Sequence, residues 1–193
     1  MAVTLVVMTA TVPDAQPPLA AAIVVGKELA EGSVDALTAR LTPLARVVHS
    51  AGEDADSFGQ VLITTGRSAG PEDLVAVVDA GCPLVTVGLV QRMVAAVEGD
   101  RAAIATGAVT DTVRHDDGSP LDRAEVVEVL SPLVGRAATF GAVAADLDGA
   151  SVEAVLRGLH RVGLVVRAVT ADSSGARVTD SASLALARAR VGP

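Results

Sequence analysis

Short apolar runs of strand length recur along this chain, and two of them lead into polar motifs. Residues 77–85 read VVDAGCPLV, and residues 107–118 read GAVTDTVRHDDG. In an open α/β sheet, ligands are held outside the carboxyl ends of the strands. A binding site is therefore expected where these two motifs begin.

Strand-like and helix-like segments alternate from one end of the chain to the other. Helices are expected over residues 86–98 and wherever a serine can cap apolar residues at helical spacing, after Ser33, Ser151 and Ser181. Strands are expected over residues 3–8, 61–65, 75–78, 104–109, 126–130 and 164–169. This alternation predicts a three-layer α/β/α sandwich around a mostly parallel sheet with right-handed crossovers.

The composition fits such a sandwich and limits the kinds of partner. The 193 residues suit one domain, and the apolar half of the chain is mainly Val, Ala and Leu, with two Phe and neither Tyr nor Trp. Small and β-branched side chains are typical of sheets covered on both faces. The formal net charge of −8 argues against a nucleic-acid partner, which normally meets a basic patch.

Cysteine and histidine offer no recognisable site. Cys82 is the only cysteine, so no disulfide can form within the chain, and a reducing cytoplasm is the expected compartment. We interpret its thiol as buried and inert. His49, His115 and His160 lack metal-ligand spacing. The apolar start, residues 1–12, is too short to span a bilayer and has no basic flank, so no membrane partner is expected.

Four motifs follow one another in a characteristic order. They are DAGCPL at residues 79–84, VTDTVR at 109–114, Asp122-Arg123 followed by Ser131-Pro132, and ARVT at 176–179. Their order and spacing resemble the 2-C-methyl-D-erythritol 4-phosphate cytidylyltransferase family, best from about residue 61 onward and more weakly over residues 23–37. The resemblance implies a Rossmann-like nucleotidyltransferase sheet with a small protruding β-arm, at about residues 110–135.

The resemblance also implies a reaction and a set of site residues. A member of this family transfers CMP from CTP to 2-C-methyl-D-erythritol 4-phosphate in isoprenoid precursor synthesis, with Mg²⁺. Asp79 would then bind the nucleotide and the metal, and Thr112 and Arg123 would bind the sugar phosphate. Arg177 stands in place of a catalytic lysine that neutralises phosphate charge. Each residue also has an ordinary structural explanation. Asp79 could cap a turn or a helix, and Arg123 could be a solvated surface side chain.

The expected arm has its own consequence. Asp117-Gly118 favours a tight reversal at its tip. In the resembled family the arm carries dimer contacts and helps to complete the partner's site, so a homodimer is expected.

The start of the chain departs from the family pattern. The family's first strand is followed by a glycine-rich loop with two cations that cradles the triphosphate. With the first strand at residues 3–8, that loop falls at residues 8–19, which contain no glycine, arginine or lysine. Cys82 also replaces a basic residue. We therefore expect a divergent cytidylyltransferase-like chain with reduced or lost activity. The alternatives are a non-catalytic paralogue, a pseudoenzyme that binds or regulates a partner, and a related sugar-nucleotide transferase using another nucleotide.

Overall fold

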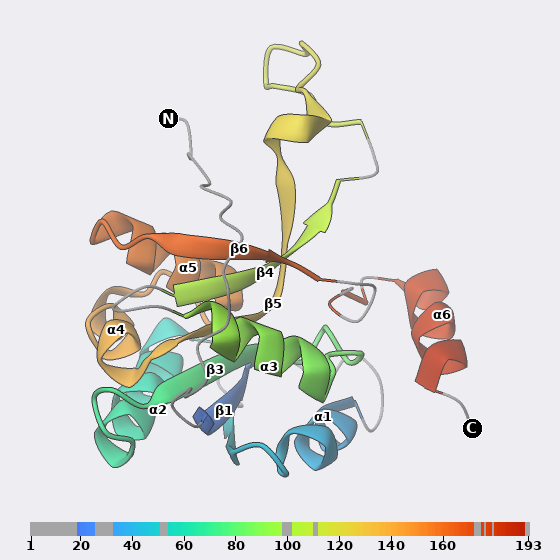
Figure 1. Ribbon diagram of the computed structural model, residues 1–193. Helices are drawn as coiled ribbons and strands as arrows, with labels where there is room; N and C mark the ends of the chain where they lie inside the picture. The colour runs from blue at the N-terminus through green and yellow to red at the C-terminus, as the bar shows by residue number, and fades with distance from the viewer. Residues whose placement is uncertain are drawn as a thin grey trace.

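A twisted β-sheet runs through the middle of the molecule in the computed structural model (Figure 1). Among the residues that the structure describes, six strands form this sheet, in the order β2-β1-β3-β5-β4-β6. Only β5 runs antiparallel to its neighbours, so the predicted mostly parallel sheet is confirmed. The described residues are 19–25, 33–50, 54–97, 102–109, 112–171, 175, 177–178 and 180–191. The strands are β1 (Leu19–Val25), β2 (Arg46–Ser50), β3 (Leu74–Asp79), β4 (Ala102–Ala108), β5 (Val127–Arg136) and β6 (Val166–Thr170).

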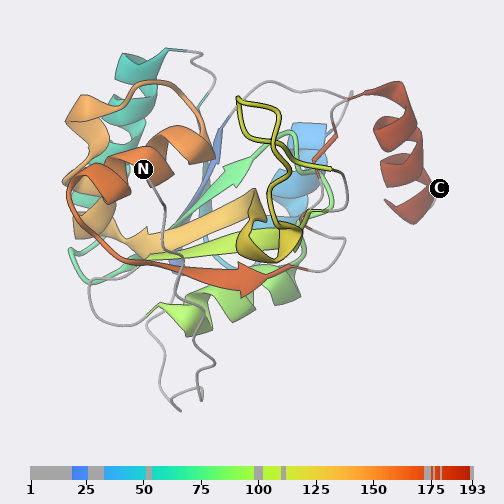
Figure 2. The ribbon, with the colours of Figure 1, turned by 90° about the horizontal axis from the view of Figure 1, so that it is seen from above.

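Helices cover both faces of the sheet, as Figure 2 shows from above. Side chains alternate along each strand, so Ala22 and Val24 of β1 pack into one core while Ile23 and Val25 pack into the other. This confirms the predicted three-layer sandwich. One face carries α1 (Ser33–Leu41) and α3 (Val87–Ala96), and the other carries α2 (Ala55–Ser68), α4 (Ala137–Gly141) and α5 (Val152–Arg161).

Several helices begin where the sequence predicts them. The Ser151 Oγ accepts a hydrogen bond from the Ala154 N–H at 3.1 Å and caps α5. Gly163 follows that helix with a φ of 76°, which favours glycine. The last helix, α6 (Ser181–Val191), stands to one side of the sheet in Figures 1 and 2. Among the helices described, none is both long and apolar enough to cross a membrane.

The strand predicted over residues 61–65 is wrong, because this stretch belongs to α2. The β-branched residues there suggested a strand. However, Phe58, Leu62 and Thr65 are buried and lie on one face of a helix. The Asp54 carboxylate accepts a hydrogen bond from the Ser57 N–H at 2.7 Å and starts that helix. Burial of a helical face therefore outweighs the local strand preference.

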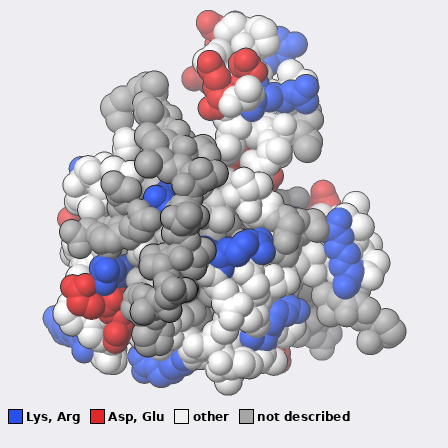
Figure 3. Space-filling model, in the orientation of Figure 1, with Lys and Arg blue, Asp and Glu red and all other residues white. Residues whose placement is uncertain are grey.

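The β-arm extends beyond the sheet. β4 and β5 remain paired as far as Ala108 and Val127, and the chain between them projects from the body (Figure 1). At the tip, the Gly118 N–H donates to the His115 carbonyl at 2.8 Å, and Gly118 has a φ of 84°. A projecting arm with a tight reversal is therefore confirmed, but the predicted range of about 110–135 extends too far, because residues 130–135 are buried in β5. Figure 3 shows acidic and basic side chains together at its outer end, where residues 114–120 are exposed.

Candidate functional site

Asp79 is the last residue of β3, and both its backbone and its carboxylate are held in place. Its N–H donates to the Ser131 Oγ on the neighbouring strand at 2.9 Å. Its Oδ1 accepts a hydrogen bond from the Gly81 N–H at 2.6 Å. This second bond forms the turn that the sequence offers as a purely structural role for Asp79. One carboxylate oxygen thus fixes the turn, and the other, Oδ2, has a different partner.

That partner is Arg177, which follows β6 in the sequence. Its Nη2 lies 2.9 Å from the Asp79 Oδ2 and also donates to the Glu153 Oε1. The next residue fixes this approach, because the Val178 N–H donates to the Gly81 carbonyl at 2.8 Å. Two residues chosen from the sequence are therefore in contact, and the roles expected of them remain predictions.

Glu153 is the residue that sequence reasoning missed. It is in the first turn of α5, where an acidic side chain usually complements the helix dipole. Nothing in its local sequence distinguishes that ordinary role from contact with Arg177. The pairing appears only when α5 and the segment after β6 come together in the fold.

The charges at this site perturb one another. Burial raises the pKa of the Asp79 carboxyl above its usual value, although the Gly81 N–H and the Arg177 charge oppose the rise. For Arg177, burial opposes the charged form, but Asp79 and Glu153 outweigh it and raise the pKa of the guanidinium. One cation is therefore shared between two carboxylates.

Cys82 lies in the turn after Asp79 and is fully buried. Burial, reinforced by the Asp79 charge, raises the pKa of its thiol to about 12. A thiol at such a pKa is protonated at neutral pH and is a poor nucleophile. The interpretation of Cys82 as buried and inert fits this environment.

A second arginine supports the turn from the other side. Arg40, in the last turn of α1, donates through Nη1 to the carbonyls of Pro83 and Val85, at 2.7 and 3.0 Å. Charged donors make strong hydrogen bonds to carbonyl oxygens. Arg40 therefore ties α1 to the segment that carries Asp79.

Thr112 and Arg123 are not part of this cluster in the same chain. Thr112 follows β4, and Arg123 opens the short helix η1 (Arg123–Glu125). Both are exposed on the segment between β4 and β5, which rises from the sheet in Figure 1. Their expected role in binding a sugar phosphate stays a prediction.

The first strand that the structure describes, β1, is not the first strand that the sequence predicts. The strand predicted at residues 3–8 lies outside the described residues, and β1 was not predicted. Val25, at the end of β1, pairs with Asp79 and accepts a hydrogen bond from the Ala80 N–H at 2.8 Å. The chain therefore leaves β1 beside Asp79, and residues 8–18 precede this strand. The segment after β1, residues 26–32, contains Gly26, Lys27 and Gly32 in sequence and lies outside the described residues.

Asp79 and Glu153 bring carboxylate oxygens, which are a ligand type that Mg²⁺ accepts. Mg²⁺ is commonly held by one or two carboxylates together with substrate phosphates, and both side chains meet at Arg177. Within the described part of the chain, no group of three or more His, Cys, Asp or Glu residues could hold a metal by itself. A Mg²⁺ ion here would share these carboxylates with Arg177 and would take its remaining ligands from a substrate phosphate and water.

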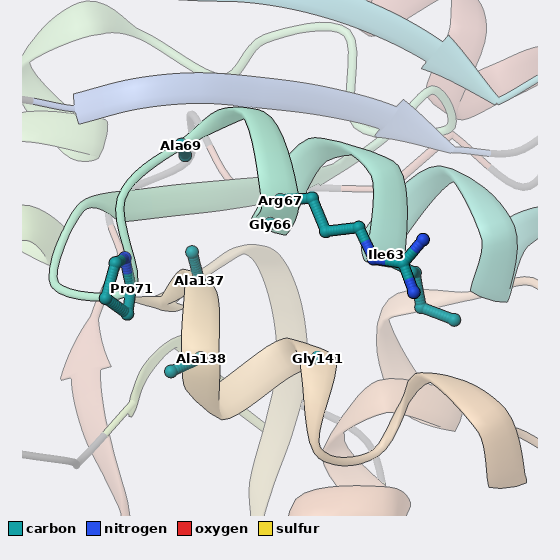
Figure 4. A pocket seen from close by; sticks show the side chains of 8 residues that line it. All are labelled: Ile63, Gly66, Arg67, Ala69, Pro71, Ala137, Ala138 and Gly141. Carbon is teal, nitrogen blue, oxygen red and sulfur yellow. The ribbon is translucent and has the colours of Figure 1, made fainter.

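A hollow between α2 and α4 lies at the other end of β3 (Figure 4). Its volume is about 490 Å³, and Pro71, Ile63, Arg67 and Ala138 are among its lining residues. Pro71 comes just before β3, whereas Asp79 ends that strand. This hollow is therefore separate from the charged cluster, and its lining offers little chemistry besides Arg67.

Solved structures resemble this fold along most of the chain. The 2-C-methyl-D-erythritol 4-phosphate cytidylyltransferase of Thermus thermophilus matches with a TM-score of 0.70 and 19% identity, over 90% of this chain and 98% of that chain. This chain has the cytidylyltransferase fold. The 4-diphosphocytidyl-2C-methyl-D-erythritol synthase of Anaerococcus prevotii matches with a TM-score of 0.65 and 15% identity, over 91% and 98% of the two chains. No family model matches the sequence, and no curated protein does.

A more distant structural match extends the comparison. A nucleotidyl transferase of Methanothermobacter thermautotrophicus matches with a TM-score of 0.58 and 13% identity, over 90% of this chain and 97% of that chain. At these identities the likeness concerns the fold, and function has to be argued from the site. The resemblance read from the order of the motifs is thus confirmed at the level of the fold.

Proposed function

We propose that this chain is a divergent cytidylyltransferase of reduced activity, which binds CTP with Mg²⁺ at the carboxyl ends of its strands. The observation that carries the proposal is the contact between Asp79 and Arg177 at the end of β3. In an open α/β sheet this is the edge where ligands bind. The expected acceptor is 2-C-methyl-D-erythritol 4-phosphate, which would place the chain in isoprenoid precursor synthesis in the cytoplasm.

The reaction needs positioned charge more than covalent chemistry. A phosphate oxygen of the acceptor attacks the α-phosphorus of CTP, and the bond from that phosphorus to the leaving pyrophosphate breaks. Bound Mg²⁺ would neutralise charge on the phosphates. Asp79 would orient the metal–nucleotide complex, while Arg177 would donate to a phosphate oxygen.

The same cluster supports the reduced activity. Arg177 brings one positive charge, and Asp79 and Glu153 bring two negative charges, so the ionised cluster carries a net charge of −1. Such a cluster neutralises a triphosphate less well than a free cation would. In addition, an uncharged buried thiol, Cys82, occupies the place of a basic residue.

The arm supports a homodimer as part of the proposal. Thr112 and Arg123 are exposed on the segment between β4 and β5. In a dimer, the arm of one chain would bring them to the Asp79 cluster of the other, where Arg123 would bind the acceptor phosphate. Light scattering should then report a dimer at micromolar concentration, and a monomer would contradict this part.

A second function is favoured by one observation. Because Arg177 is already paired with two carboxylates, the chain could keep the fold without turnover and serve as a binding or regulatory partner. A related sugar-nucleotide transferase, with another nucleotide in place of CTP, is the remaining alternative.

Calorimetric titration separates these functions. CTP with Mg²⁺ is titrated into the purified protein, with ATP as the control nucleotide and Asp79→Ala as the control variant. Selective binding of CTP that is lost in Asp79→Ala, followed by pyrophosphate release with the sugar phosphate, supports the enzyme. Selective binding of ATP supports the related transferase. No heat with any nucleotide contradicts both and favours the partner role.

A further inference from the structure

Glu153 is fixed to a rigid part of the fold. It lies in the first turn of α5, between Val152 and Ala154, which are both fully buried. The Ser151 side chain caps the same turn. The backbone of Glu153 is therefore held against the core, while its side chain is about one third exposed, at 33%.

The partner of Glu153 is a long side chain that needs such support. Arg177 is 31% exposed on its side chain, and an arginine side chain loses rotamer entropy when it is fixed. Asp79 approaches the Arg177 Nη2 from β3, and Glu153 approaches the same nitrogen from α5. Two carboxylates from separate elements define the position of this nitrogen better than one would.

We infer that Glu153 is a positioning residue, which holds the Arg177 guanidinium against Asp79 and thereby orients it toward a phosphate ligand. The inference rests on the proposed function for its catalytic consequence, since it assigns Glu153 an effect on CTP turnover. The geometric part stands on the contacts alone. Glu153 acts through Arg177 and touches no reacting atom.

Two substitutions separate positioning from a role in helix stability. Glu153→Asp keeps a negative charge in the first turn of α5, so the dipole interaction is retained, but the shorter side chain withdraws from Arg177. Glu153→Gln keeps the length and loses the charge. The matched control is Glu72→Gln, which breaks another carboxylate–guanidinium pair, 2.6 Å long, with Arg136 at the opposite end of β3 from Asp79.

The first readout is the rotation of the Arg177 guanidinium in isotope-edited NMR spectra, assigned with Arg177→Lys. In the unaltered protein we expect slow rotation and separate signals for the two Nη groups. Both Glu153 variants should average these signals, whereas Glu72→Gln should leave them separate. Unchanged Arg177 signals in both Glu153 variants would overturn the inference.

The second readout is turnover of CTP with Mg²⁺ and the sugar phosphate. A misplaced cation loses transition-state contacts, so Glu153→Asp should lower kcat by about ten- to hundredfold with KM nearly unchanged. An equal kcat in Glu153→Asp and the unaltered protein would contradict the catalytic part. If the unaltered protein shows no turnover, the proposed function fails, and the NMR comparison still decides the positioning.

Discussion

Removal of Arg177 should leave the buried Asp79 carboxylate without its charged partner and lower the free energy of unfolding. Two unit charges about 4 Å apart attract by about 4 kcal/mol at an effective dielectric constant near 20. Desolvation of the carboxylate offsets part of this gain, and solvent screens the guanidinium, whose side chain is 31% exposed. We therefore expect Arg177→Ala to lower the free energy of unfolding by about 1–3 kcal/mol at neutral pH.

The loss should depend on pH in a defined direction. The pKa of Asp79 is already raised above 3.8 in the folded protein, chiefly by burial. Arg177→Ala removes a positive charge that lowers this pKa. The Asp79 carboxyl of the folded variant therefore holds its proton more tightly than that of the unfolded chain. Stability contributed by such a group falls as pH rises above 3.8. Urea unfolding should therefore show a larger loss at neutral than at mildly acidic pH.

A double variant tests the cause of the loss. Asp79→Asn removes the charge and keeps an oxygen that can accept the Gly81 N–H. If an unpaired carboxylate destabilises Arg177→Ala, the combined variant Asp79→Asn with Arg177→Ala should regain most of the lost stability. The reasoning is refuted if the combined variant is as unstable as Arg177→Ala and if the loss is the same at both pH values.

Four further outcomes follow from local geometry. Gly59→Ala places a Cβ 2.3 Å from the Ala144 carbonyl oxygen and should destabilise the fold by about 1–3 kcal/mol in urea unfolding. In contrast, a Cβ at Gly88 meets no atom within 4 Å, so Gly88→Ala should stabilise α3 by about 0.5–1 kcal/mol. Arg40→Ala removes two hydrogen bonds to backbone carbonyls and should cost about 1–3 kcal/mol; an unchanged midpoint would argue that this tie is dispensable. Cys82 should resist iodoacetamide in the native protein and react after denaturation, and rapid native alkylation would contradict its burial.

Local sequence signals predict an element correctly where a helix cap or an apolar run matches what the fold buries. Ser151 followed by the apolar face of α5 is such a case, and so is the apolar run that forms β3. They failed where composition and packing disagree. β1 begins with Leu19 and three alanines, which have low strand propensity, and its place in the sheet is set by pairing with β2 and β3. Residues 61–65 look like a strand and are buried as part of a helix.

In the candidate site, too, residues with a local sequence signal were predicted, and a residue defined by a tertiary contact was missed. Asp79 was found because a polar residue at the end of a buried strand has a position that sequence reveals. Arg177 was found through the order of the motifs. Glu153 was missed because its partner is 24 residues away in sequence, and nothing in a first-turn glutamate indicates which tertiary contact it makes. Contacts between elements therefore have to come from the fold.

The charge of the cluster links the proposed ligand to the metal. Asp79 and Glu153 together outweigh Arg177 by one negative charge when all three are ionised, so these three side chains together would repel a bare triphosphate. Bound Mg²⁺ would reverse that balance, since it would add two positive charges to the charges of these side chains. A nucleotide should therefore bind here as its Mg²⁺ complex, and Glu153→Gln should weaken the dependence on the metal. Binding of metal-free CTP that matches binding of the complex would contradict this electrostatic argument.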